Sequence, residues 1–498
     1  MNTKIYLLKK YSLLLYFMFL SSCATNPVSG IPDFVTITEG QEISIGASYH
    51  KQILENNKII ENKELNDYFE KLGNSIAKQS HRPKLKWHFT LIDDPTFNAF
   101  ATPGGYVYMY RGMLNYFNSE AELAGVIGHE IGHITARHAV RGMSTAQITN
   151  LLLGILQSNV PGGQLTSNAF NLMNLMVNRG YSRKFELEAD QLGEEYLGKT
   201  NYDTLAMSSF LKTLKHSDEL EKKIAKSEGR EPNIGYHGVF STHPDNEKRI
   251  KALAKKSKNI SKTKNNKEKF LKLLDGSLYG SSPEEGYVKD SIFYHPIFAI
   301  KFSILDDWIL KNEPDKLILK KNEDTMILRA DELLADDLEN GLTPEQFLKD
   351  GIEKTSFLSK NELIKSEIFS HNGLEGHSYL YKTQGLMNTR YRRFTTIFDT
   401  KTFKTKPKAW IAITDLKELT NDKSSTDILR TFSKMSATEV KNSKGLRIKV
   451  IRFRDGMSYE KLAKGSPLGK FAIDKLRLLN GHYPDKSPAI GDLIKIVQ

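Results

Sequence analysis

The stretch GHEIGHITARH, residues 128–138, places three histidines and a glutamate within eleven residues. In a helix, His129 and His133 lie about 40° apart on one face, because each residue turns the helix by about 100°. Two imidazoles at this spacing can reach one metal ion, and Glu130 lies beside the first of them. His138 lies about 140° from His133 by the same arithmetic, so it cannot share an ion while the helix continues. The stretch is either a pair of metal ligands with a base and a bystander, or the polar face of an ordinary helix.

The residues around this stretch favour a helix. Ser119 and Glu122 have the spacing of a capping box. Apolar side chains then recur at steps of three and four, at Leu123, Val126, Ile127, Ile131 and Ile134. The helix also contains Gly125, Gly128 and Gly132, which lower its propensity, so another element is expected to pack closely there. On such a helix, the pattern H-E-x-x-H is typical of zinc peptidases.

A catalytic zinc usually has three protein ligands and one open position for water. The best candidate for the third ligand lies in YSRKFELEADQLGEEYLG, residues 181–198, which is expected to form a helix. Glu186 and Asp190 are four residues apart and share a face, whereas Glu188 points elsewhere. Glu186 can bind the metal while Asp190 orients a ligating histidine from behind. The alternative is an ordinary acidic helix surface.

These motifs together resemble those of the zinc metallopeptidases of family M48, which combine H-E-x-x-H with a downstream E-x-x-x-D. Residues 98–105, followed by YVYMYRGML, resemble the strand before the metal helix of that family. STHPDNEKRI, residues 241–250, resembles its later His-Pro and Arg motif, and ATNPVSG after Cys23 resembles the start of its lipoprotein members. The resemblance covers roughly residues 24–260.

The resemblance assigns roles to individual residues. It implies one Zn²⁺ per chain, bound by His129, His133 and Glu186, with Asp190 behind a ligand. Glu130 is expected to act as the general base that takes a proton from water. His243 and Arg249 are catalytic candidates that would steady the oxyanion. His243 could instead occupy the open zinc position and keep the enzyme latent.

The predicted strand before the metal helix suggests a way to bind substrate. Gly105, Tyr106, Val107 and Tyr108 would form its first half. At the edge of a sheet, this strand could accept an extended substrate through main-chain hydrogen bonds, which suits an enzyme that clears unfolded chains. The alternative is a normal paired strand with a half-buried tyrosine face.

The N-terminus indicates export. Lysines at positions 4, 9 and 10 precede the apolar run YSLLLYFMFL, so residues 1–22 are expected to be a signal peptide. LSSC resembles the lipobox of bacterial lipoproteins, in which Cys23 is lipidated. Cys23 is the single cysteine, which excludes an intramolecular disulfide. Ala24, rather than aspartate, favours the outer membrane, with the protein facing the periplasm.

The rest of the chain divides into three expected segments. Residues 261–284 are expected to be a basic, solvated linker, because lysines are densest at 251–272. Residues 285–437 are expected to form an α+β domain of unknown role, with helix from Thr343 to about Lys365. Residues 444–498 resemble a short βααβ LysM module, although Met457 stands where a threonine is usual. The net charge is +12, but a nucleic-acid groove would need interleaved aromatic residues, so no nucleic-acid partner is expected.

These observations lead to one interpretation. The fold class is α+β: a mainly helical zincin domain at 23–260 with a small β-sheet, the α+β domain and the LysM-like module. The function is a zinc metalloendopeptidase, anchored to the membrane by a lipid, that hydrolyses misfolded or unassembled envelope proteins, with peptidoglycan as a further candidate partner. The alternative is a non-catalytic chaperone, assembly factor or peptidoglycan-binding lipoprotein with a vestigial zinc site.

Overall fold

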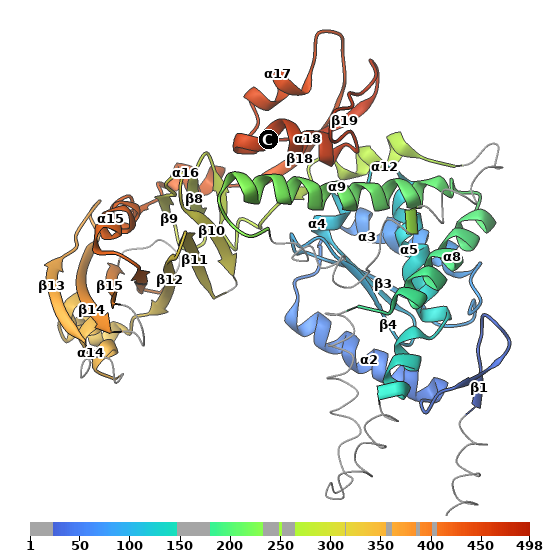
Figure 1. Ribbon diagram of the computed structural model, residues 1–498, viewed down its shortest axis with the longest axis horizontal. Coiled ribbons are helices and arrows are strands. Elements are labelled where there is room, and N and C mark those ends of the chain that lie inside the picture. Colours follow the sequence, from blue (N-terminus) through green and yellow to red (C-terminus); the bar gives the residue numbers. More distant parts are fainter. Residues whose placement is uncertain are drawn as a thin grey trace, which may run out of the picture.

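The computed structural model describes residues 23–146, 180–232, 249–250, 264–313, 315–354, 361–384, 389–400 and 406–498. The predicted signal peptide and His243 lie outside these residues. Figure 1 shows three parts: a mainly helical N-terminal domain, a middle domain rich in strands, and a C-terminal module above helix α9 (Leu205–Ser227). The α+β fold class is confirmed. Among the described residues, no helix combines the length and the apolar character needed to cross a membrane.

The N-terminal domain packs helices against a small mixed sheet. The sheet has the order β3 (His88–Ile92), β5 (Tyr106–Tyr110), β4 (Ala99–Thr102). Its helices are α2 (Glu39–Asn56), α3 (Lys63–Ala77), the short α4 (Arg111–Leu114), α5 (Glu120–Thr135), α8 (Arg183–Lys199) and α9. A two-stranded ribbon, β1 (Cys23–Thr25) and β2 (Pro32–Phe34), precedes them. The main core joins α3, the sheet, α5, α8 and α9, so α5 is buried along its whole length.

Helix α5 begins where the sequence indicates. The Ser119 hydroxyl caps it by accepting a hydrogen bond from the Glu122 backbone N–H at 3.2 Å. The Glu122 carboxylate accepts from the backbone N–H of Asn118 at 2.6 Å rather than from that of Ser119. The cap is therefore present, but the predicted reciprocal capping box is shifted by one residue.

The glycines of α5 allow α8 to approach closely, as expected. A Cβ atom on Gly132 would lie 2.9 Å from the Ala189 carbonyl oxygen of α8. On the facing helix, a Cβ atom on Gly193 would lie 2.9 Å from the backbone nitrogen of His129. Both distances are too short for real atoms, so the two backbones can meet only without these side chains. This contact brings the residues of α8 to the histidines of α5.

The prediction of a solvated linker at 261–284 is wrong for the residues that the structure describes. Helix α12 (Lys267–Leu274) buries Phe270 and Leu274 in the main core, and β6 (Leu278–Tyr279) pairs with a strand of the C-terminal module. The stretch KEKFLKLL has its apolar residues on one face of the helix and its lysines on the other. The high lysine content led to the prediction of a linker, although this stretch forms an amphipathic helix.

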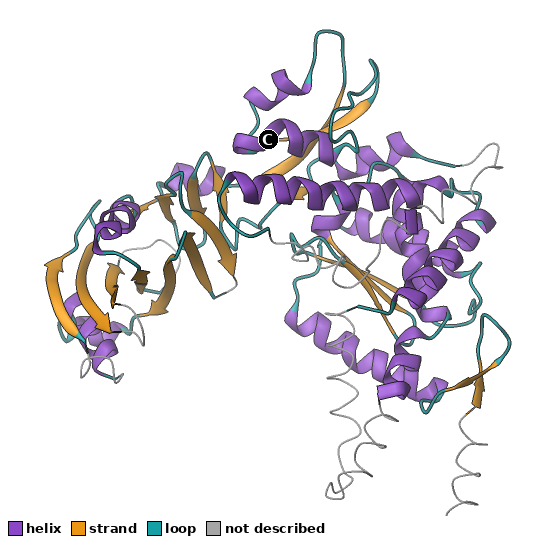
Figure 2. Cartoon of the chain, viewed as in Figure 1, coloured by secondary structure: helices purple, strands orange, loops and turns teal. Residues whose placement is uncertain are grey.

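The middle domain contains two antiparallel sheets (Figure 2). The larger sheet has the order β10 (Ile309–Glu313), β11 (Lys316–Lys321), β12 (Asp324–Glu332), β16 (Lys408–Leu416), β15 (Thr389–Asp399), β14 (Glu375–Gln384), β13 (Glu362–Ile368). The smaller sheet has the order β17 (Ser433–Lys434), β9 (Ile300–Ser303), β8 (Ile292–His295), β7 (Tyr287–Lys289). The helices are α13 (Ala335–Glu339), α14 (Pro344–Glu353), α15 (Asp422–Arg430) and α16 (Ala437–Asn442). The predicted helix to Lys365 is wrong at its end, because Glu362 already begins β13, where pairing with β14 overrides local propensity.

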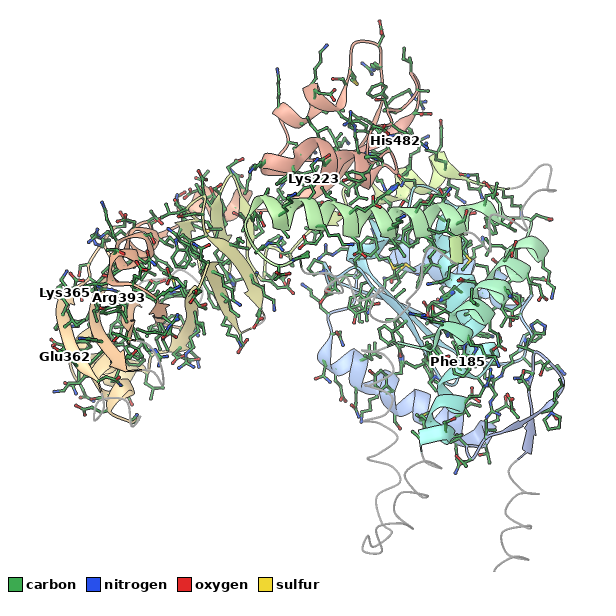
Figure 3. The ribbon with its side chains drawn as sticks, viewed as in Figure 1. Phe185, Lys223, Glu362, Lys365, Arg393 and His482 are labelled. Carbon is green, nitrogen blue, oxygen red and sulfur yellow. The ribbon has the colours of Figure 1, made fainter. Side chains whose placement is uncertain are left out.

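The C-terminal module has the predicted β-α-α-β order. Its elements are β18 (Leu446–Arg452), α17 (Tyr459–Lys464), α18 (Ala472–Leu479) and β19 (Leu493–Val497), and β6 adds a third strand beside β18. Lys223 of α9 forms an ion pair with Asp474 of α18 at 2.7 Å, on the side of α9 that Figure 3 shows toward the module. Fully buried Lys495 donates from Nζ to the carbonyl oxygens of Asn115 and Phe117, each at 2.7 Å. The module is therefore packed onto the segment that leads into α5.

Candidate metal centre

Three side chains converge between α5 and α8. The Nε2 atoms of His129 and His133 lie 3.0 Å apart. Glu186 places Oε2 3.5 Å from Nε2 of His129 and Oε1 3.5 Å from Nε2 of His133. All three residues are buried, and their candidate ligand atoms lie within 4.8 Å of one another. The structure therefore brings together the three predicted ligands as one group that could hold a metal ion.

The spacing of these atoms fits a tetrahedral zinc ion. Bonds of about 2.0–2.1 Å at tetrahedral angles separate neighbouring ligand atoms by about 3.3 Å. The separations of 3.0 and 3.5 Å among His129, His133 and Glu186 lie on either side of that value. Two imidazoles and one carboxylate are also the donor set of many catalytic zinc sites, which keep a fourth position open.

Asp190 and Arg249 lie behind His129. Asp190 Oδ1 is 2.9 Å from Nδ1 of His129, so the carboxylate orients the ring with its Nε2 toward the centre. Arg249 donates from Nε and Nη2 to the two oxygens of Asp190 at 2.7 Å each. Its Nη1 lies 3.3 Å from Oε2 of Glu186. Arg249 therefore binds both carboxylates that face His129.

The charges of this group are mutually stabilising. Burial alone would lower the pKa of His129, but hydrogen bonds with Asp190 and Glu186 raise it to about 9. Burial alone would raise the pKa of Asp190, but Arg249 and His129 hold it below its usual range. The carboxylates that attract a proton to His129 also attract a divalent cation.

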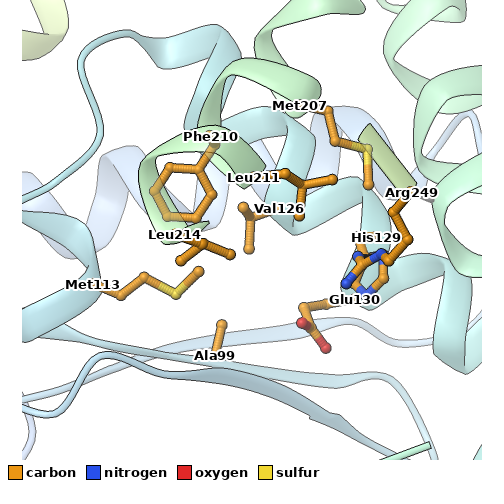
Figure 4. Close-up of a pocket in the computed structure, with 10 residues that line it drawn as sticks. All are labelled: Ala99, Met113, Val126, His129, Glu130, Met207, Phe210, Leu211, Leu214 and Arg249. Carbon is orange, nitrogen blue, oxygen red and sulfur yellow. Dashed lines mark hydrogen bonds between the residues drawn. The ribbon is translucent and has the colours of Figure 1, made fainter. Parts of the chain in front are cut away.

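Glu130 and the neighbouring His129 line a small, mostly apolar cavity of about 30 Å³ (Figure 4). The cavity is lined by Ala99, Met113, Val126, His129, Glu130, Met207, Phe210, Leu211, Leu214 and Arg249. Glu130 is only 2% exposed. Its carboxylate therefore lies next to one metal ligand and to a small, mostly apolar cavity.

His138 has a contact that the sequence analysis missed. Its Nδ1 lies 2.9 Å from Nδ1 of His133, and its Nε2 lies 3.2 Å from Oε2 of Glu188. The helix does not continue, because Arg137 has a left-handed backbone with φ of +55°. That turn brings His138 back toward His133. Arginine is not a typical residue for this conformation, so the turn could not be predicted from the residue type.

Glu188 likewise does not point away from the site. It accepts a hydrogen bond from Arg141 at 3.1 Å and from His138. The hydrogen bond with His138 is the main reason that the pKa of Glu188 is lowered to about 2. Glu186, Glu188 and Asp190 all serve the histidines of the site, although only two of them share a helix face.

The prediction that residues 105–108 form a substrate-binding edge strand is wrong. Gly105 precedes β5, and β5, which contains Tyr106, Val107 and Tyr108, is the middle strand of its sheet. It pairs with β3 on one side and with β4 on the other, so neither of its edges can accept another chain. The sequence showed a strand but could not show its neighbours. The edge strand next to the metal helix is β4.

Comparisons with known proteins agree with this geometry. Residues 63–257 match the model of peptidase family M48. A relative from Vibrio cholerae is 33% identical over 210 residues, which cover 39% of this chain and 43% of that protein. The beta-barrel assembly-enhancing protease of Escherichia coli is 29% identical over 242 residues, with 47% of each chain covered. Mitochondrial metalloendopeptidase OMA1 of Arabidopsis thaliana is 28% identical over 234 residues, with 47% of this chain and 44% of that protein covered.

The match thus spans less than half the length of these three relatives. The family model matches the part of the N-terminal domain that carries the histidines of α5 and the carboxylates of α8. The proteins matched include some that are named as proteases and metalloendopeptidases. Residues 63–257 are therefore similar to peptidase family M48 in both sequence and site geometry.

Proposed function

We propose that this protein is a zinc-dependent metalloendopeptidase of the bacterial cell envelope, with one zinc ion bound by His129, His133 and Glu186. The observation that carries the proposal is the convergence of two imidazole nitrogens and a carboxylate at 3.0–3.5 Å, with a second carboxylate adjacent. A zinc ion with bonds of about 2.0–2.1 Å fits within this group.

The residues around the centre have distinct chemical tasks. When bound, zinc supplies Lewis acidity that polarises a peptide carbonyl and makes water reactive near neutral pH. Glu130 accepts the proton of the attacking water and then delivers it to the leaving amine. Asp190 holds the ring of His129. Because Arg249 already binds two carboxylates, His243 is the stronger of the two candidates for steadying the oxyanion.

We propose that substrate pairs with the outer edge of β4, whose four residues are buried here and have to be uncovered for an incoming chain. Phe100 and Thr102 lie opposite Tyr108 and Tyr106 of β5, and the backbone N–H of Tyr110 donates to the carbonyl of Asn98. In an antiparallel ladder such hydrogen-bonded positions alternate, so the backbone groups of Ala99 and Ala101 point away from β5. An extended peptide that pairs with these two alanines would pass beside Glu130 and His133.

Two small cavities flank this path. Ala99 lines the apolar cavity at Glu130, and Ala101 lines a second one, of about 10 Å³, at His133. Main-chain pairing needs an extended backbone and no particular side chain, so it favours unfolded chains over a folded surface. We therefore propose misfolded or unassembled envelope proteins as substrates. The names of the bacterial relatives, which refer to β-barrel assembly, agree with this class.

The remaining parts complete the proposal. Residues 1–22 act as a signal peptide, and lipidation of Cys23 anchors the protein to the outer membrane, facing the periplasm. The catalytic domain comprises residues 23–260 together with helix α12, which adds Phe270 and Leu274 to its core. Residues 444–498 form a LysM-like module, with peptidoglycan as a candidate ligand, and residues 285–437 form an α+β domain.

The decisive test measures zinc and cleavage separately. The chain from residue 24 onward would be purified beside Glu130→Gln and Glu186→Ala, and zinc per chain and cleavage of an unfolded, casein-like protein would be measured. We expect one zinc in the parent, one zinc without cleavage in Glu130→Gln, and weak or no zinc binding in Glu186→Ala. A folded parent without zinc contradicts the proposal. Equal function of the parent and Glu130→Gln would instead indicate a chaperone or assembly factor.

A further inference from the structure

We propose that His138 and Glu188 form a relay that fixes the tautomer of His133, so that Nε2 of His133 is available to the metal. This inference rests on the proposed metal site. The relay runs from Oε2 of Glu188 to Nε2 of His138 at 3.2 Å, and from Nδ1 of His138 to Nδ1 of His133 at 2.9 Å. His138 is fully buried, so water does not compete for either nitrogen.

The direction of each hydrogen bond follows from the carboxylate. An ionised carboxylate only accepts, so Nε2 of His138 must carry the proton that faces Glu188. In a neutral imidazole the other nitrogen is then an acceptor, which makes Nδ1 of His133 the donor. His133 therefore carries its proton on Nδ1 and presents a lone pair on Nε2, the atom that faces His129 and Glu186. A metal ligand needs that lone pair.

Aromatic packing prevents the two rings from turning. Tyr181 stacks on His133 with ring centroids 4.2 Å apart and planes at 21°. Phe185, which Figure 3 labels, stacks on His138 with centroids 4.3 Å apart and planes at 9°. The guanidinium of Arg141 lies over the ring of Phe185, 4.5 Å from its centroid, and also donates a hydrogen bond to Glu188 at 3.1 Å. The relay is thus held both by its hydrogen bonds and by the rings that enclose it.

The two metal histidines are therefore supported in different ways. His129 meets a carboxylate directly, and that carboxylate is held by Arg249. His133 meets a carboxylate only through His138, and that carboxylate is held by Arg141. Removing such a supporting group typically weakens metal binding by about 10–100-fold. His138 is a positioning residue, since it has no contact with the metal position itself.

Substitutions of His138 test whether an acceptor at the position of its Nδ1 atom is needed for zinc binding. Asparagine places its side-chain oxygen where Nδ1 of histidine lies, whereas glutamine reaches the Nε2 position and leucine offers no acceptor. We expect the zinc affinity of His138→Asn to stay within about 3-fold of the parent, and that of His138→Gln and His138→Leu to fall about 10–100-fold. The measurement is a chelator competition on the chain from residue 24 onward. Circular dichroism and thermal unfolding without metal would confirm that each variant is folded.

A double-mutant cycle tests the link to Glu188. Glu188→Gln should weaken zinc binding in the parent but not in the His138→Asn background. The amide oxygen of asparagine at position 138 always accepts a hydrogen bond, so it does not need Glu188 to set its role. His377→Leu, a buried histidine of the middle domain, serves as the control and should leave zinc affinity unchanged. Equal affinities for the parent and all three His138 variants would overturn the relay, as would an equal loss in all three. A folded parent that binds no zinc would overturn the proposed function as well.

Discussion

Replacing Gly193 with alanine tests how closely α8 must approach the metal helix. The added Cβ atom would lie 2.9 Å from the backbone nitrogen of His129, whereas an ordinary contact begins at 3.4 Å. The three nearest atoms all belong to the backbone of α5, so no side chain can move aside. The two helices must separate by about 0.5 Å, the difference between these distances. Glu186 and Asp190, which lie on the same helix as Gly193, would move away from His129 with it.

Gly198 of the same helix provides a matched control, because a Cβ atom there would meet nothing within 4 Å. Replacing a helical glycine with alanine stabilises a helix by up to about 1 kcal/mol. Overpacking costs about 1–3 kcal/mol. We therefore expect Gly198→Ala to be neutral or stabilising, and Gly193→Ala to be less stable than Gly198→Ala by about 1–3 kcal/mol. This difference isolates the packing cost from the helix propensity.

The assay follows the N-terminal domain alone. The chain has three tryptophans, and only Trp87 lies in that domain. With Trp308 and Trp410 replaced by phenylalanine, fluorescence during urea unfolding reports the N-terminal domain, and zinc affinity is measured on the same proteins. Gly193→Ala should lose both stability and zinc affinity, while Gly198→Ala should keep both. Equal stability and equal zinc affinity of the two variants would refute the close helix contact.

Three further predictions follow from buried groups. Lys495→Met leaves two buried carbonyl oxygens without their donor and should cost the N-terminal domain about 2–4 kcal/mol in urea unfolding. Lys449→Met removes only a half-exposed ion pair with Asp275 and should cost at most about 1 kcal/mol. Burial lowers the pKa of His295 to about 4, so the unfolded chain binds more protons between about pH 6.5 and 4. The free energy of unfolding of the middle domain should therefore fall by up to about 3 kcal/mol as the pH falls through that window. It should fall less in His295→Gln, and the fluorescence of Trp308 and Trp410 reports the unfolding of this domain. Removing zinc with a chelator should lower the unfolding midpoint of the N-terminal domain in the parent but not in Glu186→Ala, because a ligand stabilises only a fold that binds it.

The candidate ligands could be predicted because their geometry is local. The four-residue spacing of His129 and His133, and of Glu186 and Asp190, places each pair on one face of a helix. Helix α5 also begins at the expected residue, since its cap depends on neighbours in the sequence. The glycines indicated that a partner approaches closely, although not which helix it is. These features need only the helical repeat and the sizes of side chains.

The errors occurred where distant residues decide the outcome. The position of β5 in the middle of its sheet depends on which strands lie beside it, and the strand pattern is the same at an edge and in the centre. The role of His138 depends on a left-handed residue at Arg137, for which composition gives no warning. The helix at 267–274 is a different kind of error, because its apolar residues share one face and this local pattern was overlooked among the lysines.

The packing of the C-terminal module changes how its role should be tested. Lys495 of β19 holds the carbonyls of Asn115 and Phe117, just before α5 begins, while the other end of α5 holds the metal ligands. Strand β6 also depends on β18 as its pairing partner. Deleting residues 444–498 would therefore disturb the metal helix as well as any glycan site. Loss of activity after such a deletion could not be assigned to glycan binding, so exposed side chains of the module have to be changed one at a time while zinc content is monitored.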